Sequence, residues 1–78
     1  MKIKNIFSTR LKGLRNQHNL TILELASRIK VSIRLIKYYE DCKSKCLPTA
    51  SRLVDLSLFF NCSVDYLLGL TDNIKTNN

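Results

Sequence analysis

The stretch LTILELASRIKVSIRLIKYYE, residues 20–40, carries two helical patterns separated by a short break. Thr21 followed three residues later by Glu24 forms the pattern of a capping box, which predicts the start of a helix. Apolar residues then recur at helical spacing on one stripe: Ile22, Leu25, Ala26 and Ile29. After the break, Ser32 is a favourable N-cap for a second helix over 32–41. The stretch therefore predicts two consecutive helices joined by a turn of three to four residues.

The residues around the break predict that these two helices cross steeply and share a core. Ala26 is small, as required where one helix passes closely over the other. One continuous apolar set spans both helices: Leu25, Ile29, Val31, Ile36 and Tyr39. Lys30 falls at the turn, where we expect a positive φ that costs a residue other than glycine ~1 kcal/mol. Many helical proteins contain such a pair, so the pair alone does not assign a function.

Helical patterns continue on both sides of this stretch, and no segment alternates apolar and polar residues as a half-buried strand would. We expect five helices: 6–17, 21–30, 32–41, 49–60 and 64–68. Asn19 and Gly69 are expected to end the first and last of them. The sequence predicts an all-α fold with one domain over 1–72 and a polar, flexible tail over 73–78.

Charge is distributed unevenly over the 78 residues, which carry a net charge of +7. Residues 1–45 hold eleven Lys and Arg against three acidic residues, a net of +8, whereas residues 46–78 have a net of −1. This asymmetry is typical of a protein that faces a polyanion on one side, although a solubilising surface explains charge alone equally well. An acidic membrane surface is disfavoured because the expected helices face a core and carry no aromatic lipid face.

Several other classes of function find no support in the sequence. No apolar run approaches the roughly 18 residues of a membrane span, and no signal peptide is visible, so we expect a cytoplasmic protein. Cys42, Cys46, Cys62 and His18 match no established metal-ligand spacing, and we expect neither metal nor cofactor. No nucleophile–base grouping or phosphate-binding loop is present, which argues against an enzyme.

The pattern of residues 20–40 resembles the phage-repressor type, Cro/Xre-like, helix-turn-helix family. It reads Leu20-Thr21-x-x-Glu24-Leu25-Ala26-x-x-Ile29-x-Val31-Ser32-x-x-x-Ile36-x-x-Tyr39-Glu40, and Pro48-Thr49 and the segment 60–69 match the family's closing part. The resemblance covers roughly residues 6–72. It implies a five-helix repressor-like domain whose second and third helices form the helix-turn-helix. It also implies a sequence-specific regulator of transcription, expected to be a repressor that binds double-stranded DNA as a homodimer, with the helix 32–41 in the major groove.

Carried over by position, the resemblance assigns roles to individual residues. Base contacts are expected from Ile33, Arg34, Lys37 and Tyr38. Phosphate contacts are expected from Thr21, Ser32, Lys43 and Lys45. Arg15 is expected to pair with Glu40 at the end of the recognition helix. Apolar residues without an evident core role, which we expect at a dimer interface, are Leu58, Phe59, Leu68 and Leu70.

Departures from the family pattern leave a second interpretation open. Ile22 stands where a glutamine commonly helps to anchor a phosphate, and Leu35 replaces a small polar residue. Asp41 adds an acid, and Cys42 replaces a glycine. The recognition helix is therefore less polar than usual, and the alternative is a protein-interaction module, antirepressor or antitoxin-like, that binds a regulatory protein partner through Ile33, Leu35 and Tyr38. RNA binding has little support because no strand platform with stacking aromatics is visible.

Overall fold

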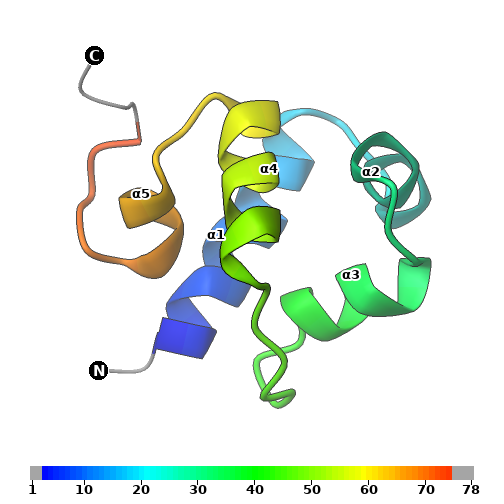
Figure 1. Ribbon diagram of the computed structural model, residues 1–78, viewed down its shortest axis with the longest axis horizontal. Coiled ribbons are helices and arrows are strands. Elements are labelled where there is room, and N and C mark those ends of the chain that lie inside the picture. Colours follow the sequence, from blue (N-terminus) through cyan, green and yellow to red (C-terminus); the bar gives the residue numbers. More distant parts are fainter. Residues whose placement is uncertain (1–2, 75–78) are drawn as a thin grey trace.

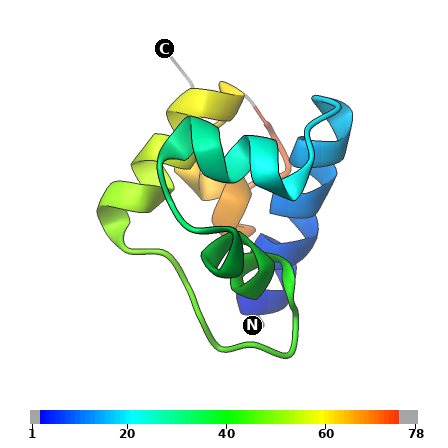
Figure 2. The same ribbon diagram turned by 90° about the vertical axis from the view of Figure 1, so that its right-hand side faces the viewer.

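Five helices, in the predicted order, form the part of the chain that the computed structural model describes, residues 3–74 (Figure 1). They are α1 (Ile3–Gln17), α2 (Ile22–Ile29), α3 (Ile33–Glu40), α4 (Ala50–Phe60) and α5 (Val64–Leu68). No strand occurs within these residues, and the prediction of an all-α, five-helix fold is confirmed. α2 and α3 cross steeply at one side of the molecule, while α5 lies at the opposite side of α1 and α4 (Figures 1 and 2).

Local capping explains where α2 and α3 begin. The Thr21 hydroxyl accepts a hydrogen bond from Glu24 N at 3.1 Å, and the Glu24 carboxylate accepts one from Thr21 N at 2.9 Å. The hydrogen bonds from Thr21 hold the pKa of Glu24 below its usual value. Ser32 caps α3 in the same manner by accepting from Leu35 N at 3.1 Å. The predicted helix 32–41 thus includes its two caps, Ser32 and Asp41.

Four residues with a left-handed backbone conformation, that is a positive φ, lie just after α1, α2, α4 and α5. Asn19, Lys30 and Asn61 have φ values of 56°, 60° and 54°, and Gly69 has a φ of 82°. The positive φ expected at Lys30 is therefore confirmed. At Gly69 a Cβ atom would lie 2.8 Å from Ile6 Cγ2, so both the backbone angle and the close approach of α1 require glycine there.

The first helix begins earlier than the sequence predicts, at Ile3 rather than at residue 6. The prediction followed the apolar spacing from Phe7 onwards and left out the turn Ile3-Lys4-Asn5. Ile3 lies four residues before Phe7, so helical periodicity was compatible with the earlier start. The side chain of Lys4 contacts α3 and the loop after it, which are distant in the sequence.

One core lies between the helices and draws on all five of them. Its buried apolar residues are Phe7, Leu11, Leu14, Leu25, Ala26, Ile36, Tyr39, Leu56, Phe60, Cys62 and Leu67. Of the apolar set predicted across the helix-turn-helix, Leu25, Ile36 and Tyr39 are fully buried, while Ile29 and Val31 pack against the core from its edge. The rings of Phe7 and Tyr39 meet edge to face at 5.9 Å and join α1 to α3.

Arg10 fastens the segment after α5 to α1. Its guanidinium donates to the carbonyls of Tyr66 and Thr71, each at 2.6 Å, and to Asp72 Oδ1 at 2.8 Å. It also stacks 4.2 Å from the centre of the Tyr66 ring.

The segment predicted as a tail, 73–78, is attached to the fold at its beginning. Ser63 N donates to the Ile74 carbonyl at 3.0 Å, and the Ile74 side chain packs against the core. Residues 75–78, and residues 1 and 2, lie outside the described residues. Where the domain ends stays a prediction.

Candidate nucleic-acid interface

The outer face of α3 presents the four side chains that were predicted to contact bases. Ile33 is 39 % exposed and Tyr38 is 47 % exposed, and Arg34 and Lys37 are also exposed. Their positions, i, i+1, i+4 and i+5, place them on one side of the helix. Ile36 and Tyr39 are buried on the opposite side and fix the rotation of α3. Leu35 is half-buried and packs against the core, so it contributes little to the outer face.

The residues predicted to contact phosphates lie at the helix starts and in the loop after α3. Thr21 and Ser32 are the N-caps of α2 and α3, where helix N–H groups without intrahelical partners favour anions. Each hydroxyl accepts a bond from its own helix and keeps its proton available for donation. Lys43 and Lys45 are exposed in the loop.

The loop after α3 has a defined conformation. Asp41 Oδ1 accepts from Lys43 N at 2.9 Å, and the Asp41 carbonyl accepts from Ser44 N at 3.0 Å. The Ser44 hydroxyl accepts from Cys46 N at 3.1 Å. One oxygen of the Asp41 carboxylate thus accepts from the backbone of its own loop.

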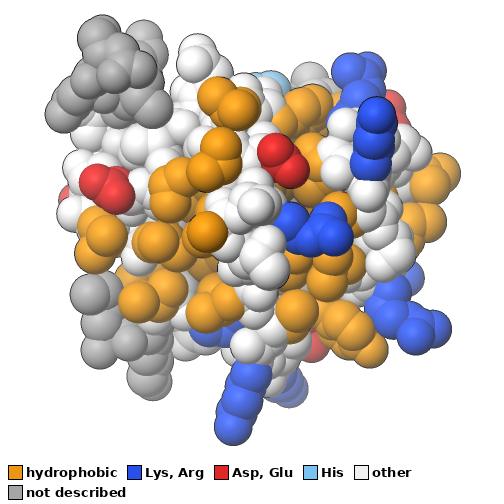
Figure 3. All heavy atoms as spheres, viewed as in Figure 1, with side chains coloured by type: hydrophobic (Ala, Val, Ile, Leu, Met, Phe, Trp, Pro, Cys, Tyr) orange, Lys and Arg blue, Asp and Glu red, His pale blue; other side chains and the backbone are white. Residues whose placement is uncertain are grey.

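Basic side chains gather on this side of the molecule. Figure 3 shows Lys and Arg along the right and lower edges, where α2, α3 and the loop after α3 lie in Figure 1. Over α4 and α5, apolar side chains are visible instead. On the face shown, basic and apolar side chains therefore occupy different regions.

Arg15 and Glu40 form a shielded ion pair that joins α1 to the end of α3. Arg15 Nε and Nη2 donate to the two carboxylate oxygens at 2.7 and 3.0 Å, and Nη1 donates to the Leu20 carbonyl at 2.8 Å. The side chains are only 11 % and 7 % exposed. The hydrogen bond to Glu40 raises the pKa of Arg15. The pair fixes the end of α3 relative to α1.

Two further side chains of α1 hold the end of α3, and sequence reasoning missed both. The Ser8 hydroxyl, fully buried, donates to the Tyr39 carbonyl at 2.6 Å. Lys4 Nζ donates to the carbonyls of Tyr38 and Tyr39 at 2.7 and 3.0 Å. Lys4, Ser8 and Arg15 are spaced by four and seven residues, which places polar groups on one face of the helix. That spacing was a signal that could have been used.

The four residues predicted at a dimer interface differ in how far their side chains are exposed to solvent. Leu58 and Leu70 are 74 % and 59 % exposed. Phe59 and Leu68 are half-buried, and the Phe59 ring packs edge to face on Phe60 at 5.0 Å. Two more exposed apolar residues on or beside α4, Leu47 and Val54, were not predicted.

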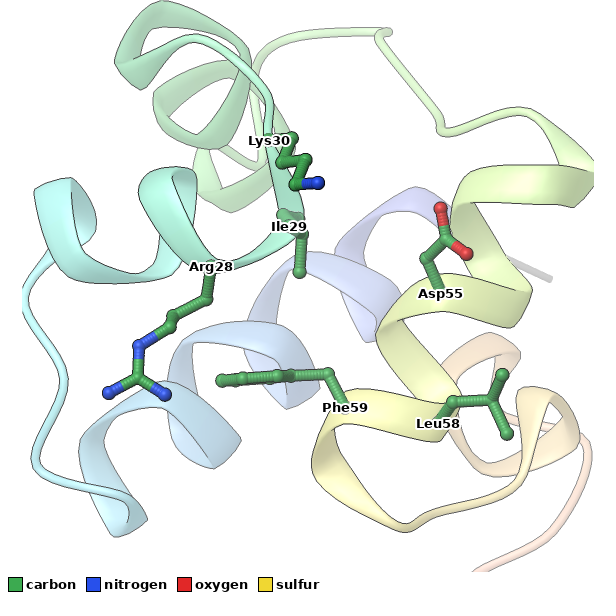
Figure 4. Close-up of a pocket in the computed structure, with 6 residues that line it drawn as sticks. All are labelled: Arg28, Ile29, Lys30, Asp55, Leu58 and Phe59. Atoms are coloured by element: carbon green, nitrogen blue, oxygen red, sulfur yellow. The ribbon is translucent and has the colours of Figure 1, made fainter.

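An open pocket of about 280 Å³ lies between the end of α2 and α4 (Figure 4). It is lined by Arg28, Ile29, Lys30, Asp55, Leu58 and Phe59. The Phe59 ring extends from α4 toward α2, and Leu58 lies at the rim, pointing outward. The pocket therefore connects α4 with the end of α2, and charged and apolar side chains both line it.

Within residues 3–74 no group of three or more His, Cys, Asp or Glu side chains is arranged to hold a metal ion. The three cysteines are free: Cys42 is exposed, Cys46 half-buried and Cys62 buried. His18 lies at the end of α1, with Nδ1 2.9 Å from the Leu14 carbonyl and its ring against Phe60. In the same part of the chain, no helix has the length and apolar character needed to cross a membrane.

Comparison with known proteins gives two findings. A family model described as a helix-turn-helix domain matches residues 9–73. An uncharacterized HTH-type transcriptional regulator of Bacillus subtilis (strain 168), YobD, is 38 % identical over 68 residues, which are 87 % of this chain and 59 % of that protein. The chain thus spans less than two thirds of the length of this relative. No solved structure gives a significant match.

Proposed function

Since the chain belongs to the Cro/Xre-type helix-turn-helix family, we propose that it is a sequence-specific, double-stranded DNA-binding regulator of transcription, a repressor that acts as a homodimer in the cytoplasm. The observation that carries this proposal is the outer face of α3. It presents Arg34, Lys37 and Tyr38 together, while the Arg15–Glu40 pair holds the helix from behind. The proposal assigns no catalytic step and needs no cofactor.

The side chains on α3 have the chemistry to distinguish base pairs. Arg34 offers two parallel donors that match O6 and N7 of guanine, the commonest specific contact in the major groove. Ile33 can pack on the methyl group of thymine, and the Tyr38 hydroxyl can reach a base edge or a phosphate. Lys37, a long and flexible cation, can serve a base or a phosphate.

The surrounding groups supply affinity that does not depend on sequence. Thr21 and Ser32, with the free N–H groups of α2 and α3, are suited to two phosphates. Lys43 and Lys45 add two cations from the loop after α3. Each phosphate that is neutralised releases counterions, so binding should weaken steeply as salt is raised.

A dimer would place two copies of α3 in successive major grooves, about 34 Å apart, and would read a pseudo-palindrome. The surface proposed for dimerisation is the apolar one formed by Leu58, Phe59, Leu68 and Leu70, with Leu58 and Leu70 as its most exposed members. It is formed by residues of α4 and of the segment from α5 onwards and includes no residue of α3, although Leu58 and Phe59 line a pocket with Arg28 and Lys30 at the end of α2. Such a dimer would repress transcription simply by occupying a promoter.

The proposed function is tested by selection from a pool of random duplex DNA at about 150 mM salt. We expect enrichment of a pseudo-palindrome whose half-sites lie about 10 base pairs apart, centre to centre. Enrichment of a single half-site would contradict the dimer and leave the base recognition intact. No enrichment, with residual binding that disappears at modest salt, would overturn sequence-specific binding.

Replacing Leu58 and Leu70 together by aspartate is expected to convert the dimer into a monomer, because two charges would have to be buried in the apolar interface. The mass in solution is measured by light scattering. Leu23→Asp is the matched control, since Leu23 is also 59 % exposed but lies on α2. If the double variant keeps the mass of the unmodified protein, the interface lies elsewhere.

A second candidate function, a protein-interaction module, is favoured by the exposure of Ile33 and Tyr38 on α3. In that case binding would depend on these apolar groups and respond weakly to salt. DNA binding would instead be steep in salt and sensitive to Arg34→Ala. Leu35 is half-buried, so the apolar surface available to a protein partner is smaller than the sequence suggested.

A further inference from the structure

Lys4 bridges the end of α3 and the loop that follows it. Its Nζ donates to the carbonyls of Tyr38 at 2.7 Å, Tyr39 at 3.0 Å and Cys46 at 2.8 Å. An ammonium group has three N–H donors, and all three are used. Two of the acceptors belong to the last turn of the helix proposed to read bases, and the third lies beyond the two lysines of the loop.

The acceptors are groups that need a partner. The last four carbonyls of a helix have no intrahelical donor and carry a partial negative charge, so a cation stabilises them. The Tyr38 carbonyl otherwise receives only a long bond, 3.4 Å, from Asp41 N, and the Tyr39 carbonyl receives the Ser8 hydroxyl. Lys4, a residue of α1, therefore supplies hydrogen-bond donors to the carbonyls at the C-terminus of α3.

Lys4 is not a solvated surface charge. Burial lowers the pKa of Lys4, and attraction to the Asp41 carboxylate is among the interactions that oppose this shift. Three carbonyls accept from the ammonium group, and the cation also lies 5.9 Å from the centre of the Phe7 ring. A lysine used in this way has no donor left for a phosphate. If Lys4 contributes to DNA binding, it does so indirectly, by positioning the end of α3 and the loop after it.

The residues that it holds include the lysines proposed to contact phosphates. Within the loop, Asp41 and Ser44 fix the backbone by local hydrogen bonds. Those bonds give the loop its shape but do not attach it to the rest of the molecule. Two contacts provide that attachment: the bond from Lys4 to the Cys46 carbonyl and the packing of the Cys46 side chain against the core. Of the two, only the Lys4 bond also joins the loop directly to the carbonyls at the end of α3.

We propose that Lys4 is a positioning residue that fixes the loop 42–46 relative to α3, so that the base-reading helix and the phosphate-contacting lysines engage DNA together. This inference rests on the proposed function. Without the bridge, the loop would have to be ordered during binding, and ordering costs affinity.

The test compares Lys4→Met with the unmodified protein on the duplex obtained by selection. We expect binding about five- to tenfold weaker, the size that ordering one or two side chains implies. We also expect non-additivity. Lys45→Ala should weaken DNA binding clearly in the unmodified protein and much less in the Lys4→Met background. DNA binding by the Lys4→Met variant should also depend less steeply on salt. A purely structural role would lower thermal stability but leave the effect of Lys45→Ala unchanged.

Two further variants keep the test decisive. Lys12→Met removes one positive charge from an exposed position of the same helix and should leave the effect of Lys45→Ala intact. Ser44→Ala removes the acceptor for Cys46 N inside the loop without touching α3. It should weaken binding in the same non-additive way, about twofold, and it carries the test if Lys4→Met does not fold.

Hydrogen exchange without DNA separates this inference from the proposed function. In Lys4→Met the amides of the loop 42–46 should exchange faster, while those of α2 stay unchanged. Unchanged exchange in the loop, or strictly additive effects with Lys45→Ala, would overturn the positioning role alone. If the unmodified protein selects no duplex, the proposed function fails, and the positioning role for DNA fails with it.

Discussion

Replacing Glu40 by alanine is expected to lower the free energy of unfolding by about 3–5 kcal/mol. The variant leaves the Arg15 guanidinium, whose side chain is 11 % exposed, without its bidentate partner. A small domain has only about 5–15 kcal/mol in total, so this loss removes a large share of its stability. Urea denaturation followed by circular dichroism measures the loss.

Two comparisons identify the cause of that loss. A double variant, Arg15→Met with Glu40→Leu, removes both charges and should recover most of the stability, because no buried charge is left unpaired. Asp72→Ala breaks the second ion pair found among residues 3–74, Arg10–Asp72, whose carboxylate is fully exposed, and should change stability little. A loss below about 1 kcal/mol for Glu40→Ala would mean that the pair behaves as an exposed one.

Replacing Arg34 by alanine is expected to weaken binding to the selected duplex by roughly 10- to 100-fold, or about 1–3 kcal/mol. Arg34 is exposed and has no partner among the described residues, so thermal stability should not change. The loss should be concentrated at one base pair of each half-site. Measuring affinity for duplexes substituted one position at a time tests this directly.

Lys43→Ala is the matched comparison for Arg34→Ala. It removes a cation from the loop after α3 and should weaken binding to all sequences by a similar factor. The salt slope should decrease by about one unit. If Arg34→Ala also weakened binding equally at every sequence, Arg34 would be contacting a phosphate, and base recognition would have to come from other residues.

Local patterns were sufficient to predict the helix-turn-helix. The capping box of Thr21 and Glu24, the N-cap Ser32 and the left-handed Lys30 involve neighbours within a few residues, so a single stretch of sequence contains them. Gly69 is a similar case, although only the fold reveals the approach of Ile6.

Contacts between distant residues could not be predicted in the same way. Lys4 donates to carbonyls 34 to 42 residues away, and backbone carbonyls leave no trace in a pattern of side chains. Phe59 and Leu68 did not fall on the apolar stripe predicted to face the core, yet both are half-buried. In a domain this small, the edge of the core extends to residues that a helical stripe would leave outside.

The Arg10 contacts hold Thr71 and Asp72, in the segment after α5, against α1. Ile74 is bound to Ser63 beside α5, at the side of the molecule opposite α3, whereas α1 begins beside the end of α3 (Figures 1 and 2). A fluorophore or a fused domain attached beyond residue 74 would therefore start far from the proposed DNA surface. The same addition before residue 3 would start next to it. Labels for binding measurements belong at the carboxyl end.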